Sequence, residues 1–375
     1  MKRLLKFLGL LCVLLVAYLL LWPVPIEPVA WTPTASAGYV GPHAANDRLA
    51  GLTEIPVAPE VGPEHIAFGP HGRLYTGVLS GAILRMDPDG GGRETFVHTG
   101  GRPLGMEFDA AGRLIVADAL KGLLAVDPDG EIHVLADRFG DDPVRYADAV
   151  VIASDGRIYL TDASRRLSPA DWGTFDAALL DILEHSCTGR VLVYQPSDGQ
   201  LRLVIGGLCF PNGLALSADQ QSLLIAETAE YRVWKVDAAA RGLDARAIDP
   251  AGLPPATARV ILANLPGFPD NLTRDPEGRF WTGLTKPRSA AIDAMADKPL
   301  LRKIMLRLPR SLWPVPPSYG HVLAFDEDGR ILLDLQDPEG KVPETSGATE
   351  HQGRLYIQSL HGQAMGVIDL AQFAP

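Results

Sequence analysis

The chain has 375 residues, of which 47% are hydrophobic and 21% are charged. This composition supplies enough apolar side chain for a large core and excludes a disordered tail or a coiled coil. The formal net charge of −11 offers no basic footprint to a phosphate backbone, so we exclude nucleic acid as a partner. The 38 glycines and 31 prolines are spread along the chain in turn-like contexts such as Asp127-Pro128-Asp129-Gly130, which favours many short strands and an all-β fold.

The N-terminus carries an apolar run from Leu4 to Trp22 that only Lys6 interrupts. A helix of this length just crosses the hydrocarbon layer of a bilayer, which is about 30 Å thick. Because Lys2, Arg3 and Lys6 precede or begin the run, the positive-inside rule keeps the N-terminus in the cytoplasm. We therefore predict a transmembrane helix, a signal anchor over residues 1–22, and a single-pass membrane protein whose remaining chain lies on the periplasmic or extracytoplasmic side.

A cleaved signal peptide is the alternative, because Ala35-Ser36-Ala37 has the small-x-small form of a cleavage site. That site follows the apolar run at an unusually large distance, which favours the uncleaved anchor. Residues 23–55 are predicted to be a Pro-rich linker and lead-in, and residues 56–375 the globular part. Of the three cysteines, Cys187 and Cys209 belong to this part, and the sequence leaves open whether they form a bridge or stay two separate thiols.

One local pattern, a turn followed by a strand, a connection and a second strand, occurs six times. The first strands follow His71-Gly72-Arg73, Ala111-Gly112-Arg113, Asp155-Gly156-Arg157, Asp219-Gln220-Gln221, Glu277-Gly278-Arg279 and Gln352-Gly353-Arg354. The second strands include Ile83–Asp87, Leu123–Asp127, Val191–Tyr194, Val233–Asp237, Val322–Asp326 and Met365–Asp369. Small sheets that cannot bury both faces alone become stable when they stack radially, so the repeat predicts a six-bladed β-propeller. The irregular spacing of the units favours blades with loop insertions over a stacked solenoid.

Two insertions between these units have helical periodicity. They span Pro169–His185 and Ser289–Leu312, and the second carries an apolar stripe with basic residues between. We expect both helices to pack on a face of the propeller. A lid or a second membrane contact is the alternative for the later helix.

Acidic and amide residues occupy equivalent places in different repeats, in short loops just before the first strands. They are Glu64, Asp148, Asn212, Asp270 and Asn271. In a closed ring equivalent places converge on the axis, so these oxygens are expected at one end of the central channel. Carboxylate and amide oxygens suit Ca²⁺, whereas the absence of His and Cys from the set disfavours zinc. Each residue taken alone has a simpler explanation as a turn former or a solvated acid; the shared register across repeats favours the metal site.

Several ordered motifs resemble the strictosidine-synthase-like family. They are Gly62-Pro63-Glu64, Gly101-Arg102-Pro103-Leu104-Gly105, Leu183-Glu184-His185 with Thr188-Gly189-Arg190, Phe210-Pro211-Asn212-Gly213, Ala226-Glu227-Thr228 with Tyr231-Arg232, and Leu265-Pro266-Gly267-Phe268-Pro269-Asp270-Asn271. That family looks like a branch of the six-bladed propellers that include the gluconolactonase and regucalcin group and the paraoxonases. The resemblance implies that Glu64, Asn212 and Asp270 match calcium-ligand positions, and that Asn271 matches an extra amide of paraoxonases. Asp148 departs from the pattern, since it stands where an Asn is usual, but its carboxylate still suits calcium.

Two further departures limit what the resemblance implies about activity. The stretch Thr345–His351 lacks the glutamate with which strictosidine synthase assists its condensation, and Glu344 and Glu350 flank the gap without filling it. The loop Pro103–Met106 likewise lacks the first histidine of the paraoxonase pair. We therefore do not expect a true strictosidine synthase.

Two functions from different classes compete. The first is a calcium-dependent hydrolase of lactones or related esters, in which Asp270 is the catalytic base and Arg102 orients a small-molecule substrate. For Arg102 a salt bridge between blades is an equally good explanation. The second is a non-catalytic, membrane-tethered propeller that binds a ligand or a protein, because the fold alone does not choose between catalysis and binding.

Overall fold

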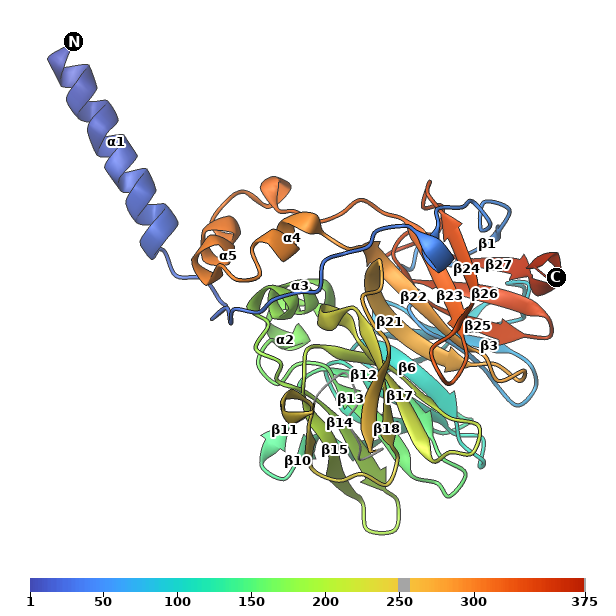
Figure 1. Ribbon diagram of the computed structural model, residues 1–375. Helices are drawn as coiled ribbons and strands as arrows, with labels where there is room; N and C mark the ends of the chain where they lie inside the picture. Colours follow the sequence, from blue (N-terminus) through green and yellow to red (C-terminus); the bar gives the residue numbers. More distant parts are fainter. Residues whose placement is uncertain (249–256, 374–375) are drawn as a thin grey trace.

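The computed structural model describes residues 1–248 and 257–373 and shows six antiparallel blades around one axis, with a long N-terminal helix that projects from them (Figure 1). Blades 1 and 2 consist of β2 Ile66–Phe68, β3 Leu74–Gly77, β4 Ala82–Met86, β5 Glu94–His98, and of β6 Pro103–Phe108, β7 Leu114–Asp118, β8 Gly122–Val126, β9 Ile132–Ala136. Blade 3 consists of β12 Ala147–Ile152, β13 Ile158–Asp162, β14 Gly189–Gln195, β15 Gln200–Leu208 and the short parallel strand β19 Leu243–Asp244.

Blades 4 and 5 consist of β16 Pro211–Leu216, β17 Ser222–Glu227, β18 Arg232–Asp237, β20 Ala258–Leu262, and of β21 Gly267–Arg274, β22 Phe280–Pro287, β23 Gly320–Phe325, β24 Ile331–Asp337. Blade 6 combines β25 Thr345–His351, β26 Arg354–Ser359 and β27 Ala364–Asp369 with β1 Thr53–Pro56 from the N-terminal side. A separate small ribbon pairs β10 Arg138–Phe139 with β11 Asp142–Pro143. The predicted six-bladed propeller is confirmed.

Pairing of the two ends of the globular chain closes the ring. Strand β1 pairs with β27, with Thr53 opposite Val367, so the last blade contains both early and late residues. The innermost strands contact one another in the order β2, β6, β12, β16, β21, β25 and back to β2. Every blade thus contributes one strand to the wall of the central channel.

The repeated turn before the second strand of a blade has a simple physical basis. In blade 2, Asp109 Oδ1 accepts hydrogen bonds from the backbone N–H groups of Ala111 and Arg113, both at 2.9 Å. Gly112 adopts a φ of 81°, which a side chain would disfavour, and the Arg113 guanidinium returns to Asp109 Oδ2 at 2.8 Å. Blade 5 repeats this arrangement with Asp275 and Arg279 at 2.6 Å.

The innermost strands are irregular at one shared position. A register shift occurs between Pro103 and Met106, Ala147 and Val150, Pro211 and Leu214, Pro269 and Leu272, and Thr345 and Ala348. Such bulges re-aim side chains that would otherwise alternate across the sheet. The sequence predicts loop positions for the acidic and amide residues, and this is wrong for Asp148, Asn212, Asp270 and Asn271, which lie in innermost strands. The repeated motif covers only the second and third strands of each blade, so it does not reveal the innermost strand.

Both insertions are helical, in shorter pieces than predicted. The first divides into α2 Pro169–Trp172 and α3 Thr174–Glu184, because Gly173 interrupts it with a φ of 73°. The second comprises α4 Ala290–Ala294, α5 Pro299–Leu306 and the 3₁₀ turn η4 Arg310–Leu312. The remaining 3₁₀ turns are η1 Gly41–His43, η2 Thr228–Glu230, η3 Ala245–Ala247 and η5 Leu370–Phe373. Together the helices cover the end of the channel where the acidic residues lie.

The segment 23–37 is packed against these helices rather than extended into solvent. Ile26 is fully buried in a cluster with Leu180, Ile292 and Met305. The Trp31 ring stacks on His185 with 3.9 Å between ring centroids. The division of the chain at residues 22/23 and 55/56 stays a prediction, but the segment predicted as a linker contributes side chains to the core.

Two further features bear on the N-terminal half. Helix α1 spans Lys2–Leu21, has a mean hydropathy of 2.7 in its most apolar window and buries none of its residues, so it is long and apolar enough to cross a membrane. Cys187 and Cys209 form a disulfide that spans 22 residues. This resolves the alternative that the sequence left open, and it fits an oxidising compartment.

Candidate metal centre and its cavity

The bulged inner strands bring the five predicted metal ligands to one end of the channel. Asp148 lies in β12, Asn212 in β16, and Asp270 and Asn271 in β21, whereas Glu64 lies just before β2. None of the five residues is more than 5% exposed. Blade 2 contributes Leu104 and blade 6 contributes Ser346 at the corresponding places. The five predicted metal ligands therefore come from blades 1, 3, 4 and 5.

Glycine allows the close approach that this convergence needs. A Cβ atom on Gly213 would collide with the backbone oxygen of Asp270 and the backbone nitrogen of Leu272. Strands β16 and β21 therefore pack closely only because residue 213 has no side chain. This contact places Asn212 beside Asp270, where its side chain opposes the rise in the pKa of the Asp270 carboxyl.

Four oxygen atoms of the centre are buried without a hydrogen-bond donor among the described residues. They are Glu64 Oε2, Asn212 Oδ1, Asp270 Oδ1 and Asn271 Oδ1. The amide nitrogen of Asn271 donates to Glu64 Oε1 at 2.6 Å and to the Glu64 backbone oxygen at 2.9 Å, which orients the Asn271 oxygen away from Glu64. Buried acceptors normally have partners, so four orphaned oxygens in one cluster fit a cation that the protein is built to hold.

The electrostatics of the centre agree with this reading. Burial raises the pKa of Glu64 to about 7, although Arg102 and Asn271 oppose that shift. Burial and the neighbouring carboxylates raise the pKa of Asp148 and of Asp270 well above the ordinary range. The three carboxylates resist ionising together unless positive charge compensates them.

Arg102 supplies part of that compensation. Its side chain is 3% exposed and donates from Nη2 to the Gly62 backbone oxygen at 3.0 Å, whereas Nε and Nη1 have no partner among the described residues. The carboxylates of Glu64, Asp118 and Asp148 act on its pKa, so Arg102 belongs electrostatically to the centre. Three ionised carboxylates and one guanidinium carry a net charge of −2, which one divalent cation neutralises.

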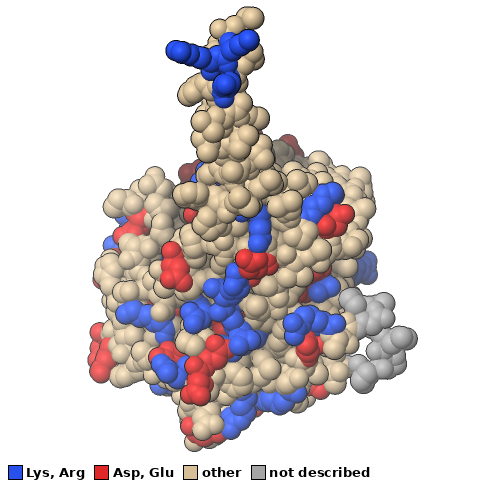
Figure 2. Space-filling view, turned by 90° about the vertical axis from the view of Figure 1, so that its left-hand side faces the viewer, with Lys and Arg blue, Asp and Glu red and all other residues tan. Residues whose placement is uncertain are grey.

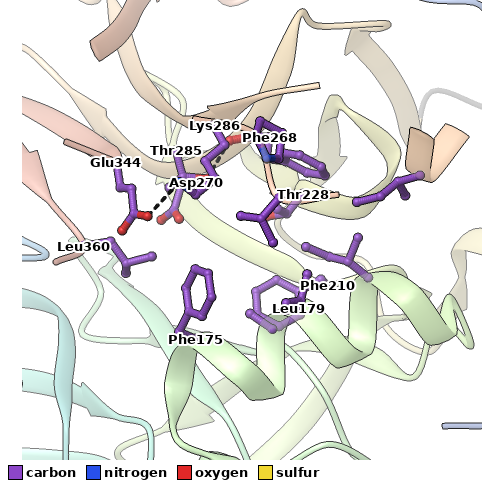
Figure 3. A pocket seen from close by; sticks show the side chains of 15 residues that line it. Phe175, Leu179, Phe210, Thr228, Phe268, Asp270, Thr285, Lys286, Glu344 and Leu360 are labelled. Atoms are coloured by element: carbon purple, nitrogen blue, oxygen red, sulfur yellow. Dashed lines mark hydrogen bonds and ion pairs between the residues drawn. The ribbon is translucent and has the colours of Figure 1, made fainter. Parts of the chain in front are cut away.

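A mostly apolar cavity adjoins the centre at Asp270 (Figure 3). Its empty volume is about 640 Å³, open solvent at its mouth included. Phe175, Leu179 and Ile182 of α3 form one wall, and Asp270 belongs to the opposite side. A small organic molecule in this cavity would therefore contact apolar side chains and one residue of the acidic cluster at once.

Sequence reasoning missed a polar group on the wall of this cavity. Lys286 Nζ lies 2.8 Å from Glu344 Oε1, and His361 Nδ1 hydrogen-bonds the other Glu344 oxygen. Glu344 has a φ of 52°, unusual for a residue with a side chain. The bonds to His361 and Lys286 outweigh burial and lower the pKa of Glu344 to about 2. The only sequence signal was the position of Glu344 next to the stretch where the resemblance implies an active-site acid.

Other clusters of potential ligands have different explanations. Ligand atoms lie within 4.8 Å of one another in His185/Cys187/Cys209, in His43/His321/Asp334 and in Asp127/Glu131/His133, and the three channel carboxylates do not form such a group. The first cluster contains the disulfide. In the second, Asp334 Oδ2 already accepts from His43 at 2.8 Å and from His321 at 3.0 Å. In the third, Asp127 Oδ2 already hydrogen-bonds His133 Nε2 at 3.0 Å.

Comparisons with known proteins agree with this geometry. The strictosidine synthase-like N-terminal family matches residues 41–86, and the SMP-30/gluconolactonase/LRE-like region matches residues 67–306. The adipocyte plasma membrane-associated protein of Danio rerio is 30% identical over 93% of this chain and 85% of its own length. The strictosidine synthase-like 13 protein of Arabidopsis thaliana is 34% identical over 75% of this chain and 73% of its own.

Solved structures share the fold at low sequence identity. A gluconolactonase of Xanthomonas campestris superposes with a TM-score of 0.58 at 19% identity and covers 92% of this chain and 96% of its own. A calcium-binding regucalcin of Agrobacterium tumefaciens gives a TM-score of 0.55 at 14% identity, over 85% of this chain and 94% of its own. With the family matches and the two sequence relatives, these findings show that the chain belongs to the strictosidine-synthase-like family of six-bladed, SMP-30/gluconolactonase-like propellers.

Proposed function

We propose that the protein is a calcium-dependent hydrolase of lactones or related esters, held at the extracytoplasmic side of a membrane by α1. The observation that carries this proposal is that Asp270 belongs both to the acidic centre and to the wall of the cavity. Its Oδ1 belongs to the cluster of buried oxygens without donors, and the same residue lines the apolar cavity. A substrate in the cavity therefore meets the acidic centre at Asp270.

Calcium fits the donor set because it accepts six to eight oxygen ligands in flexible geometry, and Glu64, Asp148, Asn212, Asp270 and Asn271 offer carboxylate and amide oxygens only. A calcium ion bound there supplies a Lewis acid that polarises the carbonyl of an ester. Asp270 is the proposed proton acceptor for the attacking water, since it reaches the cavity and lacks a donor on Oδ1. Arg102 does not line the cavity, so its proposed role, to orient the polar end of the substrate through Nε and Nη1, requires that this end reach the acidic centre beyond Asp270.

The remaining walls define what the cavity accepts. Phe175, Leu179 and Phe268 exclude water from the apolar part of a substrate, and Lys286 offers an ammonium group at the same wall as Glu344. Blade 6 places Ser346 at the axis, and its hydroxyl donates to the Glu64 backbone oxygen at 2.7 Å. No carboxylate stands there, which argues against the condensation chemistry of strictosidine synthase.

A substrate panel with and without calcium tests the proposal. We expect the full-length protein in detergent to hydrolyse some lactones or aryl esters at saturating calcium, and to lose this activity in chelator and regain it with calcium. Absence of turnover across the panel, in protein that binds calcium and melts at a higher temperature with it, would contradict the hydrolase. That result would favour the non-catalytic propeller, in which the ion stiffens the ring.

A further inference from the structure

The insertion between β22 and β23 lies against the end of α1 (Figure 1). Arg307, which directly follows α5, donates from Nε to the Trp22 backbone oxygen at 2.6 Å and from Nη1 to the Leu19 backbone oxygen at 2.9 Å. In return the Tyr18 hydroxyl donates to the Arg307 backbone oxygen at 3.0 Å. The last carbonyls of a helix have no partner within it, so these bonds cap α1 and fix its end to the insertion.

The insertion exposes large apolar side chains at this place. Leu312 is 63% exposed, Leu300 is 54% exposed and Leu301 is 43% exposed. Figure 2, which faces this side of the molecule, shows mainly uncharged side chains around the base of α1, with most acidic and basic side chains further from it. Apolar side chains gathered beside the end of a membrane-type helix are more than the scattered exposure normal for a soluble surface.

Geometry identifies the bilayer as the occupant of this face. If α1 crosses the membrane, its capped end at Leu19 to Trp22 lies at the membrane boundary. Arg307, the residue after α5, hydrogen-bonds this end directly, so α5 lies close to the same boundary. The headgroup region on each side of the hydrocarbon core is several ångströms thick, roughly 5–8 Å. We propose that the insertion, by Leu300, Leu301 and Leu312, docks on the outer surface of the same bilayer that α1 enters. The proposal rests on α1 crossing that bilayer and is independent of hydrolysis.

The contact is apolar rather than electrostatic. The cations of the insertion are already engaged within the protein, since Lys303 pairs with Glu27 at 2.6 Å, Arg310 pairs with Asp176, and Arg302 and Arg307 donate to backbone oxygen atoms. Few free positive charges therefore remain on this face to recognise anionic headgroups. Docking should depend on buried apolar area and little on the charge of the lipid.

Docking also has a consequence for the cavity. Val315 is 39% exposed, lies three residues after the end of η4 and lines the cavity together with Ile292 of α4. The insertion that faces the bilayer is thus one wall of the cavity that adjoins the acidic centre.

Site-specific fluorescence in liposomes tests the proposal with the full chain. In a Cys12→Ser background that keeps the Cys187–Cys209 disulfide, single cysteines replace Leu300, Leu301 or Leu312 and carry an environment-sensitive dye. The matched control is Val134→Cys, because Val134 is 60% exposed on β9 of blade 2, across the ring from blade 5. A dye on native Cys12, which lies near the middle of α1, reports on the anchor itself and is read with lipid nitroxides placed deep in the acyl chains.

We expect lipid nitroxides placed near the headgroup to quench dyes at positions 300, 301 and 312 at least threefold more strongly than at position 134, equally in neutral and in anionic liposomes. Quenching at Cys12 with none at the three leucine positions would overturn docking and leave the anchor intact. No quenching at Cys12 would overturn both the anchor and docking. Quenching at the leucines only with anionic lipid would overturn the apolar contact. Circular dichroism of each labelled protein checks that it is folded.

Discussion

Two sets of buried carboxylates in the same ring differ in how completely their oxygen atoms are hydrogen-bonded. Glu227, at the end of β17, is fully buried and has partners on both oxygens, from the Cys209 N–H at 2.7 Å and the Trp234 indole at 2.6 Å. Asp162, at the end of β13, accepts from the Tyr146 N–H at 3.0 Å and from the Arg190 guanidinium at 2.9 Å. Glu64 and Asp270 are equally buried, yet each keeps one oxygen without a donor.

Burial alone therefore does not mark the functional site, because all of these carboxylates are buried. The difference lies in how completely their charge is compensated. Glu227 and Asp162 each have a guanidinium of their own, from Arg232 and Arg190. In the channel one guanidinium, Arg102, faces three carboxylates. The first set is expected to stabilise the ring as it stands, and the second only with a bound cation.

The largest expected effect comes from breaking the satisfied set. Glu227→Ala would leave the Trp234 N–H and the Cys209 N–H buried without an acceptor and remove the partner of Arg232. Loss of one partner from a buried charge pair typically costs about 3–5 kcal/mol. We expect the free energy of unfolding, measured by urea denaturation, to fall by that order.

The same loss should appear with and without calcium, since Glu227 does not belong to the channel cluster. Glu277→Ala is the matched control, because the side chain of Glu277 is 60% exposed. A Glu227 variant as stable as wild type would show that its hydrogen bonds only offset the cost of burial. The comparison between the two sets would then lose its basis.

Calcium is expected to give the next largest effect. An ion that binds only the folded state adds about 2.7 kcal/mol of stability at 100 times its dissociation constant. Thermal melts of chelated protein should therefore shift upward with calcium and less with magnesium, which prefers a smaller octahedral shell. Identical melts in calcium and chelator would mean that the orphaned oxygens do not bind the ion.

Asp270→Asn tests a carboxylate of the incompletely compensated set in the channel. The amide keeps one oxygen ligand and removes one of the clustered charges, so we expect calcium affinity to fall by at least about tenfold, or 1.4 kcal/mol. Hydrolysis should fall further than binding, because an amide does not accept the proton. Calorimetry gives the affinity, and turnover at saturating calcium gives the catalytic loss.

In chelator the Asp270→Asn protein should be at least as stable as wild type, in contrast to Glu227→Ala. Burial and the neighbouring carboxylates already oppose ionisation of Asp270 when no ion is bound, so the amide removes that conflict. Calcium uptake unchanged in Asp270→Asn, and equally unchanged in Glu64→Ala, would refute the site and the mechanism proposed on it.

The sequence predicted the blade count and the set of candidate ligands because both repeat with the ring. The turn of Asp109 and Gly112 recurs from blade to blade, and Asp148, Asn212 and Asp270 share one register. Repeated short motifs therefore predicted both the repeated blades and the residues that converge at the axis. Lys286, Glu344 and His361 were not predicted, because they meet across two blades and have no repeated motif. The packing of Ile26 was missed for a related reason, since a Pro-rich composition indicates an extended chain but not what that chain covers.

The smallest expected effect concerns Asp181 of α3, which lies between the two sets in its degree of compensation. It is 1% exposed, and one oxygen accepts from the Ser164 hydroxyl at 2.6 Å. Burial raises its pKa to about 7, and the nearby Glu184 adds to the shift.

Since the folded-state pKa of Asp181 lies above the unfolded value of about 3.9, this group favours folding fully below pH 4, and its contribution is lost as the pH rises toward 7. Asp181→Asn should remove that part of the pH dependence, a change of about 1 kcal/mol between pH 6 and pH 7 in urea denaturation at saturating calcium. Asp198→Asn, at an exposed turn, should keep the wild-type slope. If wild type and Asp181→Asn show the same slope, the single bond from Ser164 already compensates the buried charge, and Asp181 joins the satisfied set.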